Sequence, residues 1–174
     1  HLVANGSDGR VVNGTTGESP TLSAAESVDL FRAVRQAVDV PVIAGTGSND
    51  TAHAIRQSEA AAGIGVDALL VVAPYYNKPS QAGLERHFRL LASATDLPVI
   101  LYDIPGRTGR KIDTATIVRL AHDVDTIVAL KDAAGSPGET ANLIAAAPDD
   151  FDVNGVRITA LLKPLRRWRR DSAG

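Results

Sequence analysis

The sequence predicts an α/β fold: an incomplete (β/α)8, or TIM, barrel of five to six parallel strands that lacks the first and the last strands. Short apolar runs bounded by turn residues alternate with longer segments of helical periodicity. This alternation predicts a parallel sheet covered by helices. A barrel typically needs about 250 residues, whereas the chain has 174. A doubly wound sheet is the alternative, but the chain contains neither GxGxxG nor GxxxxGKS/T, the glycine-rich motifs of nucleotide-binding folds.

The strands are assigned to continuous apolar runs, because a strand inside a parallel sheet is buried on both faces. The clearest is the run Ala-Leu-Leu-Val-Val near the middle of the chain. The expected strands are residues 9–13, 41–45, 67–73, 97–102 and 127–131, and residues 152–153 begin a further one.

The helices are assigned to segments in which apolar residues recur every three to four positions. The first is marked by a capping box, because Ser23 and Glu26 stand three residues apart just ahead of its apolar stripe. We expect Gly63 to end the second helix, since glycine readily takes the left-handed conformation that follows many helices. The expected helices are residues 21–38, 51–62, 81–94, 114–122 and 138–146.

The composition of the chain excludes several classes of protein and several kinds of site. The formal net charge of -2 gives the whole chain no electrostatic reason to bind nucleic acid or a membrane surface. The absence of cysteine excludes disulfides, thiolate metal sites and cysteine nucleophiles. No apolar stretch is long enough to span a bilayer and nothing resembles a signal peptide, so the cytoplasm is the expected compartment. Because the chain begins at His1 and passes through a turn cluster into a strand, we expect a fragment that begins inside a fold.

The composition changes near the C-terminus, which suggests a barrel domain of residues 1–153 and a basic tail of residues 154–174. From Val156 onward, six lysine and arginine residues face one acidic residue, and the only tryptophan, Trp168, lies there. Such a tail can bind nucleic acid or another acidic surface. We favour the alternative of a non-homologous end, because tail and body are unrelated in composition.

Lys131 is the principal candidate for chemistry. It ends the last long apolar run, and the carboxyl ends of the strands form the active-site face of α/β barrels. Burial there disfavours the ammonium form and lowers the pKa of a lysine, and a neutral amine can attack a carbonyl to form a Schiff base. The alternative is a lysine whose charged head reaches back to water.

Further candidates follow the other predicted strands. Residues 14–19 offer backbone amides and hydroxyl groups that can bind a carboxylate or relay a proton, or they form only a polar turn. Two of the three tyrosines lie in residues 74–80, and the third, Tyr102, ends a strand. A buried tyrosine beside a lysine can act as an acid or base, and Arg107 suits the capture of a carboxylate. The structural alternatives are tyrosines that pack at a rim and an arginine paired with a nearby acid.

Four motifs occur in order along residues 1 to about 153. They are Gly-Thr-Thr-Gly-Glu-Ser at 14–19, Tyr-Tyr-Asn-Lys-Pro-Ser at 75–80, Tyr-Asp-Ile-Pro-Gly-Arg-Thr-Gly at 102–109 and Lys-Asp-Ala at 131–133. Together they resemble the dihydrodipicolinate synthases of the pyruvate-dependent class I aldolase family, which also includes N-acetylneuraminate lyase. The Thr-Thr pair and the Gly-Arg-Thr-Gly run are more similar to the synthases than to the lyases.

The resemblance implies condensation of pyruvate with L-aspartate 4-semialdehyde through a lysine Schiff base, giving 4-hydroxy-tetrahydrodipicolinate for lysine and diaminopimelate biosynthesis. It implies that Lys131 forms the imine with pyruvate and that Tyr102 shuttles protons, with no metal or organic cofactor. The other implied roles are proton relay by Thr15 and Tyr76, contact with the pyruvate carboxylate by Thr16, and contact with the carboxylate of the aldehyde by Arg107. Because the family tyrosine matching Tyr76 comes from a neighbouring subunit, a homo-oligomer is implied, a tetramer built as a dimer of dimers.

The resemblance also has gaps. The first strand of the family is absent before His1, and the segment after Val153 does not resemble the family, so the last two strands are expected to be missing. We therefore expect this chain on its own to be inactive. Two alternatives stay open: another pyruvate-dependent aldolase or lyase on the same scaffold, and a catalytically dead remnant whose basic tail binds polyanions.

Overall fold

The computed structural model describes residues 1–155, which contain one six-stranded sheet with the strand order β1-β2-β3-β4-β5-β6. Each strand runs parallel to the next strand of the chain and pairs with it. The strands are β1 (Arg10–Val12), β2 (Val42–Gly45), β3 (Ala68–Val72), β4 (Val99–Asp103), β5 (Ile127–Asp132) and β6 (Asp152–Asn154).

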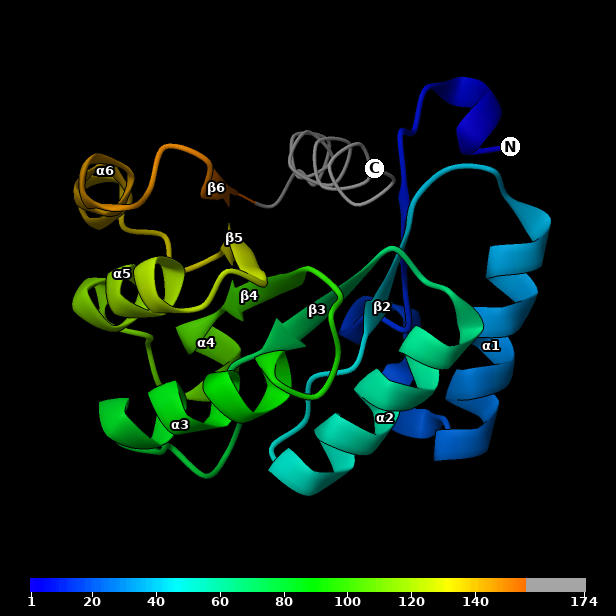
Figure 1. The fold of residues 1–174 in the computed structure, drawn as a ribbon, viewed down its shortest axis with the longest axis horizontal. Coiled ribbons are helices and arrows are strands. Elements are labelled where there is room, and N and C mark those ends of the chain that lie inside the picture. Colours follow the sequence, from blue (N-terminus) through cyan, green and yellow to red (C-terminus); the bar gives the residue numbers. More distant parts are fainter. Residues whose placement is uncertain (156–174) are drawn as a thin grey trace.

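The helices connect successive strands and lie on one side of the sheet. Figure 1 shows α1, α2, α3, α5 and α6 following one another along an arc, with the strands inside it. The helices are α1 (Ala24–Ala37), α2 (Thr51–Ile64), α3 (Gln81–Ala92), α4 (Pro105–Thr108), α5 (Thr114–Asp123) and α6 (Pro137–Ala146). A doubly wound sheet would reverse its strand order and carry helices on both faces. The consecutive order and one-sided cover therefore make this a partial α/β barrel, as the sequence predicts.

Alternation along the strands divides the apolar side chains into two layers. Toward the helices, Leu69 and Leu101 pack in one large cluster with Phe31 and Phe88, and all four are fully buried. The opposite face of the sheet, the inner face of the barrel, has its own smaller cluster. Its buried members are Ile43, Ala68, Leu70, Ile100 and Ala129.

The helix ends test the sequence signals directly. The capping box at α1 is present, because the Ser23 side chain accepts from the Glu26 amide and the Glu26 side chain accepts from the Ser23 amide. The prediction that Gly63 ends α2 is wrong. The helix continues to Ile64, and Gly65 is the left-handed residue (φ +83°) whose amide donates to the carbonyls of the last turn. Both glycines precede the same strand, so spacing alone did not separate them.

Several predicted boundaries move by a few residues. The first helix begins at Ala24 rather than at residue 21, because Ser19–Thr21 forms a short 3-10 turn before the cap. The short helix α4 and the 3-10 turn Thr15–Gly17 were expected only as loop. The predicted basic tail lies almost wholly outside the described residues, and no helix within those residues is both long and apolar enough to cross a membrane.

Candidate active site

Lys131 and Tyr102 lie side by side at the carboxyl end of the sheet. The two residues are direct partners in the pairing of β4 with β5, so their side chains point to the same face. That face is the inner one, because Tyr102 packs against the inner cluster and Lys131 stands two residues after Ala129, a member of it. The Lys131 Nζ atom is 4.2 Å from the centroid of the Tyr102 ring.

Burial shifts the pKa values of both groups. It lowers the pKa of the Lys131 amine, which favours the neutral form that can act as a nucleophile. Burial raises the pKa of the Tyr102 phenol, and the positive charge of Arg107 partly opposes that effect. A protonated phenol beside an amine whose pKa is lowered is suited to proton transfer during imine chemistry.

Arg107 belongs to the loop that follows β4. The loop turns at once into the one-turn helix α4, in which the amides of Arg107 and Thr108 donate to the carbonyl of Ile104. Thr108 is buried, and its hydroxyl donates to the carbonyls of Ile104 and Arg110. Arg107 itself is exposed. Its guanidinium is therefore accessible to a ligand, and its charge is near enough to Tyr102 to lower the pKa of the phenol.

Thr15 and Thr16 follow β1 at the same end of the sheet, in the 3-10 turn Thr15–Gly17. The turn starts after Asn13, whose backbone is left-handed (φ +62°) and whose side-chain Nδ2 atom donates to the carbonyl of Gly45. Gly45 has no room for a side chain, because a Cβ atom there would lie 2.5 Å from the carbonyl oxygen of Asn13. The close approach of β1 and β2 thus directs the chain into the turn that exposes both threonines.

Tyr76 lies in the loop after β3 and is the most exposed large apolar side chain of the described part, at 88%. Its backbone is left-handed (φ +70°), an uncommon conformation for a bulky residue. Its amide donates to the carbonyl of Thr108 at 3.3 Å, which ties the loop after β3 to the loop that carries Arg107. The Tyr76 ring is therefore almost fully exposed on a residue whose backbone conformation is restricted.

The structure brings some of the predicted residues into contact and leaves others apart. Lys131 and Tyr102 touch, and the charge of Arg107 reaches Tyr102. The side chains of Thr15, Thr16 and Tyr76 make no hydrogen bond with either residue within residues 1–155, although all three follow strands at the same edge of the sheet. Their proposed roles in proton relay and carboxylate binding remain predictions.

Three residues near the pair were not singled out from the sequence. Asn154 of β6 is the pairing partner of Lys131 on the side opposite Tyr102, and its buried Nδ2 atom has no hydrogen-bond partner among the described residues. Asp103 and Asp132 directly follow Tyr102 and Lys131, and they pair with each other across β4 and β5. The sequence did contain a signal for both aspartates, because Tyr102 and Lys131 are each followed directly by aspartate.

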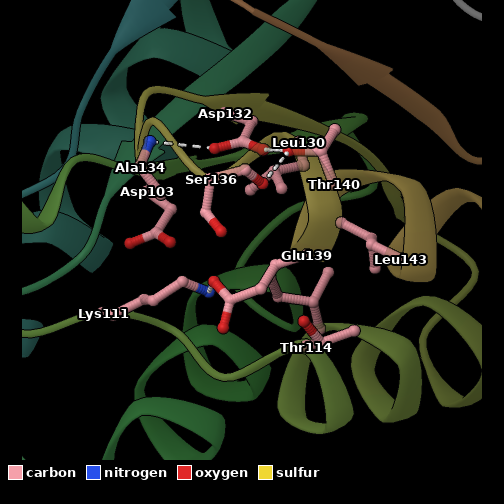
Figure 2. A pocket seen from close by; sticks show the side chains of 11 residues that line it. Asp103, Lys111, Thr114, Leu130, Asp132, Ala134, Ser136, Glu139, Thr140 and Leu143 are labelled. Carbon is pink, nitrogen blue, oxygen red and sulfur yellow. Dashed lines mark hydrogen bonds and ion pairs between the residues drawn. The ribbon is translucent and has the colours of Figure 1, made fainter.

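The two aspartates belong to a polar pocket behind the Lys131–Tyr102 pair. Figure 2 shows Asp103, Lys111, Asp132 and Glu139 around this pocket, between the strands and the helices α5 and α6. Lys111 and Glu139 form an ion pair of 3.0 Å. Within residues 1–155, no group of three or more histidine and carboxylate side chains could hold a metal ion. An ion pair and hydrogen bonds connect the polar side chains that line the pocket.

Comparison with known sequences connects this geometry to one family. Residues 1–158 match the model of the dihydrodipicolinate synthetase family. A 4-hydroxy-tetrahydrodipicolinate synthase from Desulforamulus reducens is 55% identical over 153 residues, which cover 87% of this chain and 52% of that protein. The chain spans about half the length of the curated relatives it matches.

Solved structures give the same relationship in three dimensions. A dihydrodipicolinate synthase from Bacillus anthracis superposes with a TM-score of 0.87 at 50% identity, covering 88% of this chain and 53% of that chain. The enzyme from Acinetobacter baumannii, solved in complex with pyruvate, superposes with a TM-score of 0.84 at 42% identity, covering 88% of this chain and 53% of that chain. The described fold is therefore similar to about half of each of these structures.

Proposed function

This chain belongs to the dihydrodipicolinate synthetase family, and we propose that its site condenses pyruvate with L-aspartate 4-semialdehyde to give 4-hydroxy-tetrahydrodipicolinate. The observation that carries the proposal is the contact between Lys131 and Tyr102, 4.2 Å from amine to ring centroid on the inner face of the sheet. The relative from Acinetobacter baumannii was solved with pyruvate, which supports pyruvate as the first substrate. We place the reaction in the cytoplasm and in lysine biosynthesis.

The first step is attack of the neutral Lys131 amine on the keto carbon of pyruvate. Loss of water gives an imine, and its protonated form withdraws electrons so that the pyruvate methyl group becomes acidic. Tyr102 is positioned to donate its phenolic proton in one step and to take a proton back in another, since burial raises the pKa of its phenol and keeps it protonated at the start. In this proposal Thr15 and Tyr76 relay those protons to solvent, and Thr16 binds the pyruvate carboxylate.

The second step joins the two substrates. The enamine that follows loss of the methyl proton attacks the aldehyde carbon of L-aspartate 4-semialdehyde and forms the new carbon–carbon bond. The amino group of that substrate then attacks the imine carbon, which closes the ring and frees the Lys131 amine. We assign Arg107 to the carboxylate of the aldehyde, because a guanidinium matches a carboxylate with two hydrogen bonds and Arg107 is exposed beside Tyr102.

We also propose that the active protein is a homo-oligomer, a tetramer built as a dimer of dimers. Tyr76 supports this, because an 88% exposed aromatic ring on a left-handed residue is poised to enter a neighbouring subunit. The expectation that this chain is inactive on its own remains a prediction. Each experiment therefore uses the chain itself and a chimaera in which residues 1–155 replace the matching segment of the Desulforamulus reducens enzyme.

Imine trapping tests the proposal. Pyruvate with borohydride should reduce the imine to a stable secondary amine and add mass to the peptide that contains Lys131. The matched controls are Lys131→Arg, which should abolish the addition, and Lys111→Arg, which should retain it. Addition that persists in Lys131→Arg would contradict the proposal. Trapping without consumption of L-aspartate 4-semialdehyde by the chimaera would instead indicate another aldehyde partner, as in other pyruvate-dependent aldolases.

A further inference from the structure

We propose that Asp103 is a positioning residue that sets the place of Arg107 by tying both ends of the loop after β4 to one point of the strand. The inference rests on the proposed function, because it concerns how the site receives the second substrate. Asp103 is 1% exposed, and it is the last residue of β4, directly after Tyr102. The loop leaves the strand at Ile104 and returns at Ile112.

The return of the loop is held by the Asp103 side chain. Its Oδ1 atom accepts a hydrogen bond from the amide of Ile112 at 3.2 Å, and the Ile112 side chain is fully buried. The main chain of Asp103 is held as well, because its carbonyl accepts from the amide of Ala133 at 2.9 Å. One residue thus joins the start of the loop, the end of the loop and the strand that carries Lys131.

Hydrogen bonds within the loop hold its middle together. The amide of Arg107 donates to the Ile104 carbonyl at 2.8 Å, and the Thr108 hydroxyl donates to the Arg110 carbonyl at 2.8 Å. A segment with fixed internal geometry moves as a unit when one of its ends is released. The position of the Arg107 guanidinium over the inner face therefore depends on how firmly the two ends are tied to β4.

Another side chain holds the same segment, but to a different element. Gln81 of α3 donates to the carbonyl of Lys111 at 2.9 Å and accepts from the amide of Asp113 at 3.0 Å. These bonds fix the end of the loop to a helix on the outside of the barrel. Among the hydrogen bonds of residues 1–155, the bond from Ile112 to Asp103 is the one that fixes the end of the loop to the strand that carries Tyr102, and this distinction makes Asp103 specific to the site.

Asp103 cannot act on substrate itself. Neighbouring residues of a strand point to opposite faces, so Tyr102 faces the inner side of the barrel while Asp103 faces the helices. Figure 2 shows its carboxyl group in the polar pocket with Lys111, Asp132 and Glu139. A group on the far side of the sheet can influence the reaction only through the residues that it holds in place.

The environment of Asp103 indicates which substitution should preserve its role. The pKa of Asp103 is raised to about 6, mainly by burial and to a smaller degree by the charges of Asp132 and Glu139, while the Ile112 bond and Lys111 oppose the rise. In either protonation state one oxygen can accept the amide hydrogen of Ile112. Asparagine offers the same acceptor without a charge, whereas alanine offers none, so Asp103→Asn and Asp103→Ala form a matched pair.

Asp132 provides a second control at the paired position. Its Oδ1 atom accepts from the Ala134 amide and its Oδ2 atom from the Thr140 hydroxyl. These bonds hold the loop after β5, which contains no arginine between Lys131 and α6. Asp132→Ala removes a half-buried carboxylate from the same pocket, yet it leaves the hydrogen bond at Ile112 in place.

Limited trypsin digestion of the full chain tests the clamp without any need for activity. The exposed Arg107 and Arg110 are its reporters, and Arg56, exposed in α2, is the internal standard for global unfolding. Asp103→Ala should speed cleavage after Arg107 and Arg110 about tenfold relative to Arg56, as expected for losing the bond that closes the loop. Asp103→Asn and Asp132→Ala should cleave at the parent ratio. An unchanged ratio in Asp103→Ala would overturn the proposal.

The consequence for the site is tested in the chimaera. Asp103→Ala should raise the half-saturating concentration of L-aspartate 4-semialdehyde about tenfold, while pyruvate trapping at Lys131 proceeds at the parent rate, because imine formation does not need Arg107. Asp103→Asn should restore the parent value. Equal loss of trapping and of aldehyde use would show a merely structural role. If the parent itself traps no pyruvate, the proposed function fails, and the digestion result still decides whether the clamp exists.

Discussion

Tyr102 and Lys131 are direct pairing partners across two neighbouring parallel strands, and the lysine amine lies 4.2 Å from the centroid of the tyrosine ring. The sheet itself sets this relationship, because paired residues of adjacent strands point to the same face. Both side chains are half-buried, at the edge of the apolar inner face, so a ligand can reach them from solvent. A pair placed by backbone hydrogen bonds keeps its geometry without help from mobile loops.

The first prediction is that Tyr102→Phe lowers turnover by about 10²–10⁴-fold, the usual loss when a general acid or base is removed. The ring that contacts Lys131 is retained, so the change isolates the phenolic proton. Turnover by the chimaera and pyruvate trapping at Lys131 are measured together. A turnover within about tenfold of the parent would show that another group carries the proton.

The second prediction concerns Arg107 and has a control within the same loop. Arg107→Ala should impair the use of L-aspartate 4-semialdehyde about 10- to 100-fold, as expected for losing a charge-assisted pair, and it should leave the pyruvate imine intact. Arg110 is also exposed, and its guanidinium donates to the Lys78 carbonyl at 3.4 Å. Arg110→Ala should therefore retain aldehyde use. If the two variants lose the same amount, the effect is one of loop stability rather than of substrate binding.

The fold was predictable because its strands are continuous apolar runs, which are typical of a parallel sheet that is buried on both faces. The alternation of strands and helices, the parallel sheet and the position of Lys131 at the end of β5 all followed from that pattern. Helix ends were harder, since they depend on single backbone conformations. Gly63 and Gly65 are the same residue type two positions apart, so the sequence does not show which of them ends α2. The structure does, because Gly65 has a positive φ.

The candidate site was predictable only in part. Lys131, Tyr102 and Arg107 could be proposed as candidates because their chemistry is distinctive and each follows or ends a strand. Asp103 was missed because its importance lies in one hydrogen bond to Ile112, nine residues away, and in its outward direction. Neither the hydrogen-bond partner nor the direction of the side chain can be read from the residue type, since an aspartate after a strand most often belongs to an ordinary turn.

The third prediction compares two glycines. A Cβ atom at Gly47 would lie 2.4 Å from the backbone nitrogen of Val72, whereas a Cβ atom at Gly63 would meet nothing within 4 Å. Gly47→Ala should therefore lower the free energy of unfolding by about 1–3 kcal/mol, because overpacking against the backbone pushes the loop after β2 away from β3. Gly63→Ala lies inside helix α2 and should raise it by about 0.5–1 kcal/mol. Urea unfolding of both variants measures the two changes in the free energy of unfolding. A Gly47→Ala variant as stable as the parent would contradict the close approach of Gly47 to Val72.

The fourth prediction concerns His87, a histidine of α3 that is 4% exposed. A ring nitrogen lies 2.8 Å from the Thr51 hydroxyl of α2, and the other, Nε2, has no hydrogen-bond partner among the described residues. Burial lowers the pKa of His87 to about 4. The folded protein therefore binds this proton less readily than the unfolded chain, in which histidine titrates near its ordinary pKa of about 6.5.

The sign of the pH dependence follows from this difference. Above pH 6.5 both states leave His87 neutral and its full contribution to stability is present. As the pH falls from 6.5 toward 4, only the unfolded chain takes up the proton, and up to about 3 kcal/mol of stability is lost. Urea unfolding at pH 7.5 and pH 5 should show a smaller loss in His87→Gln than in the parent. Phe88→Leu, a change at the neighbouring aromatic residue, should lower stability equally at both pH values, and a His87→Gln variant with the slope of the parent would exclude His87 as the group responsible.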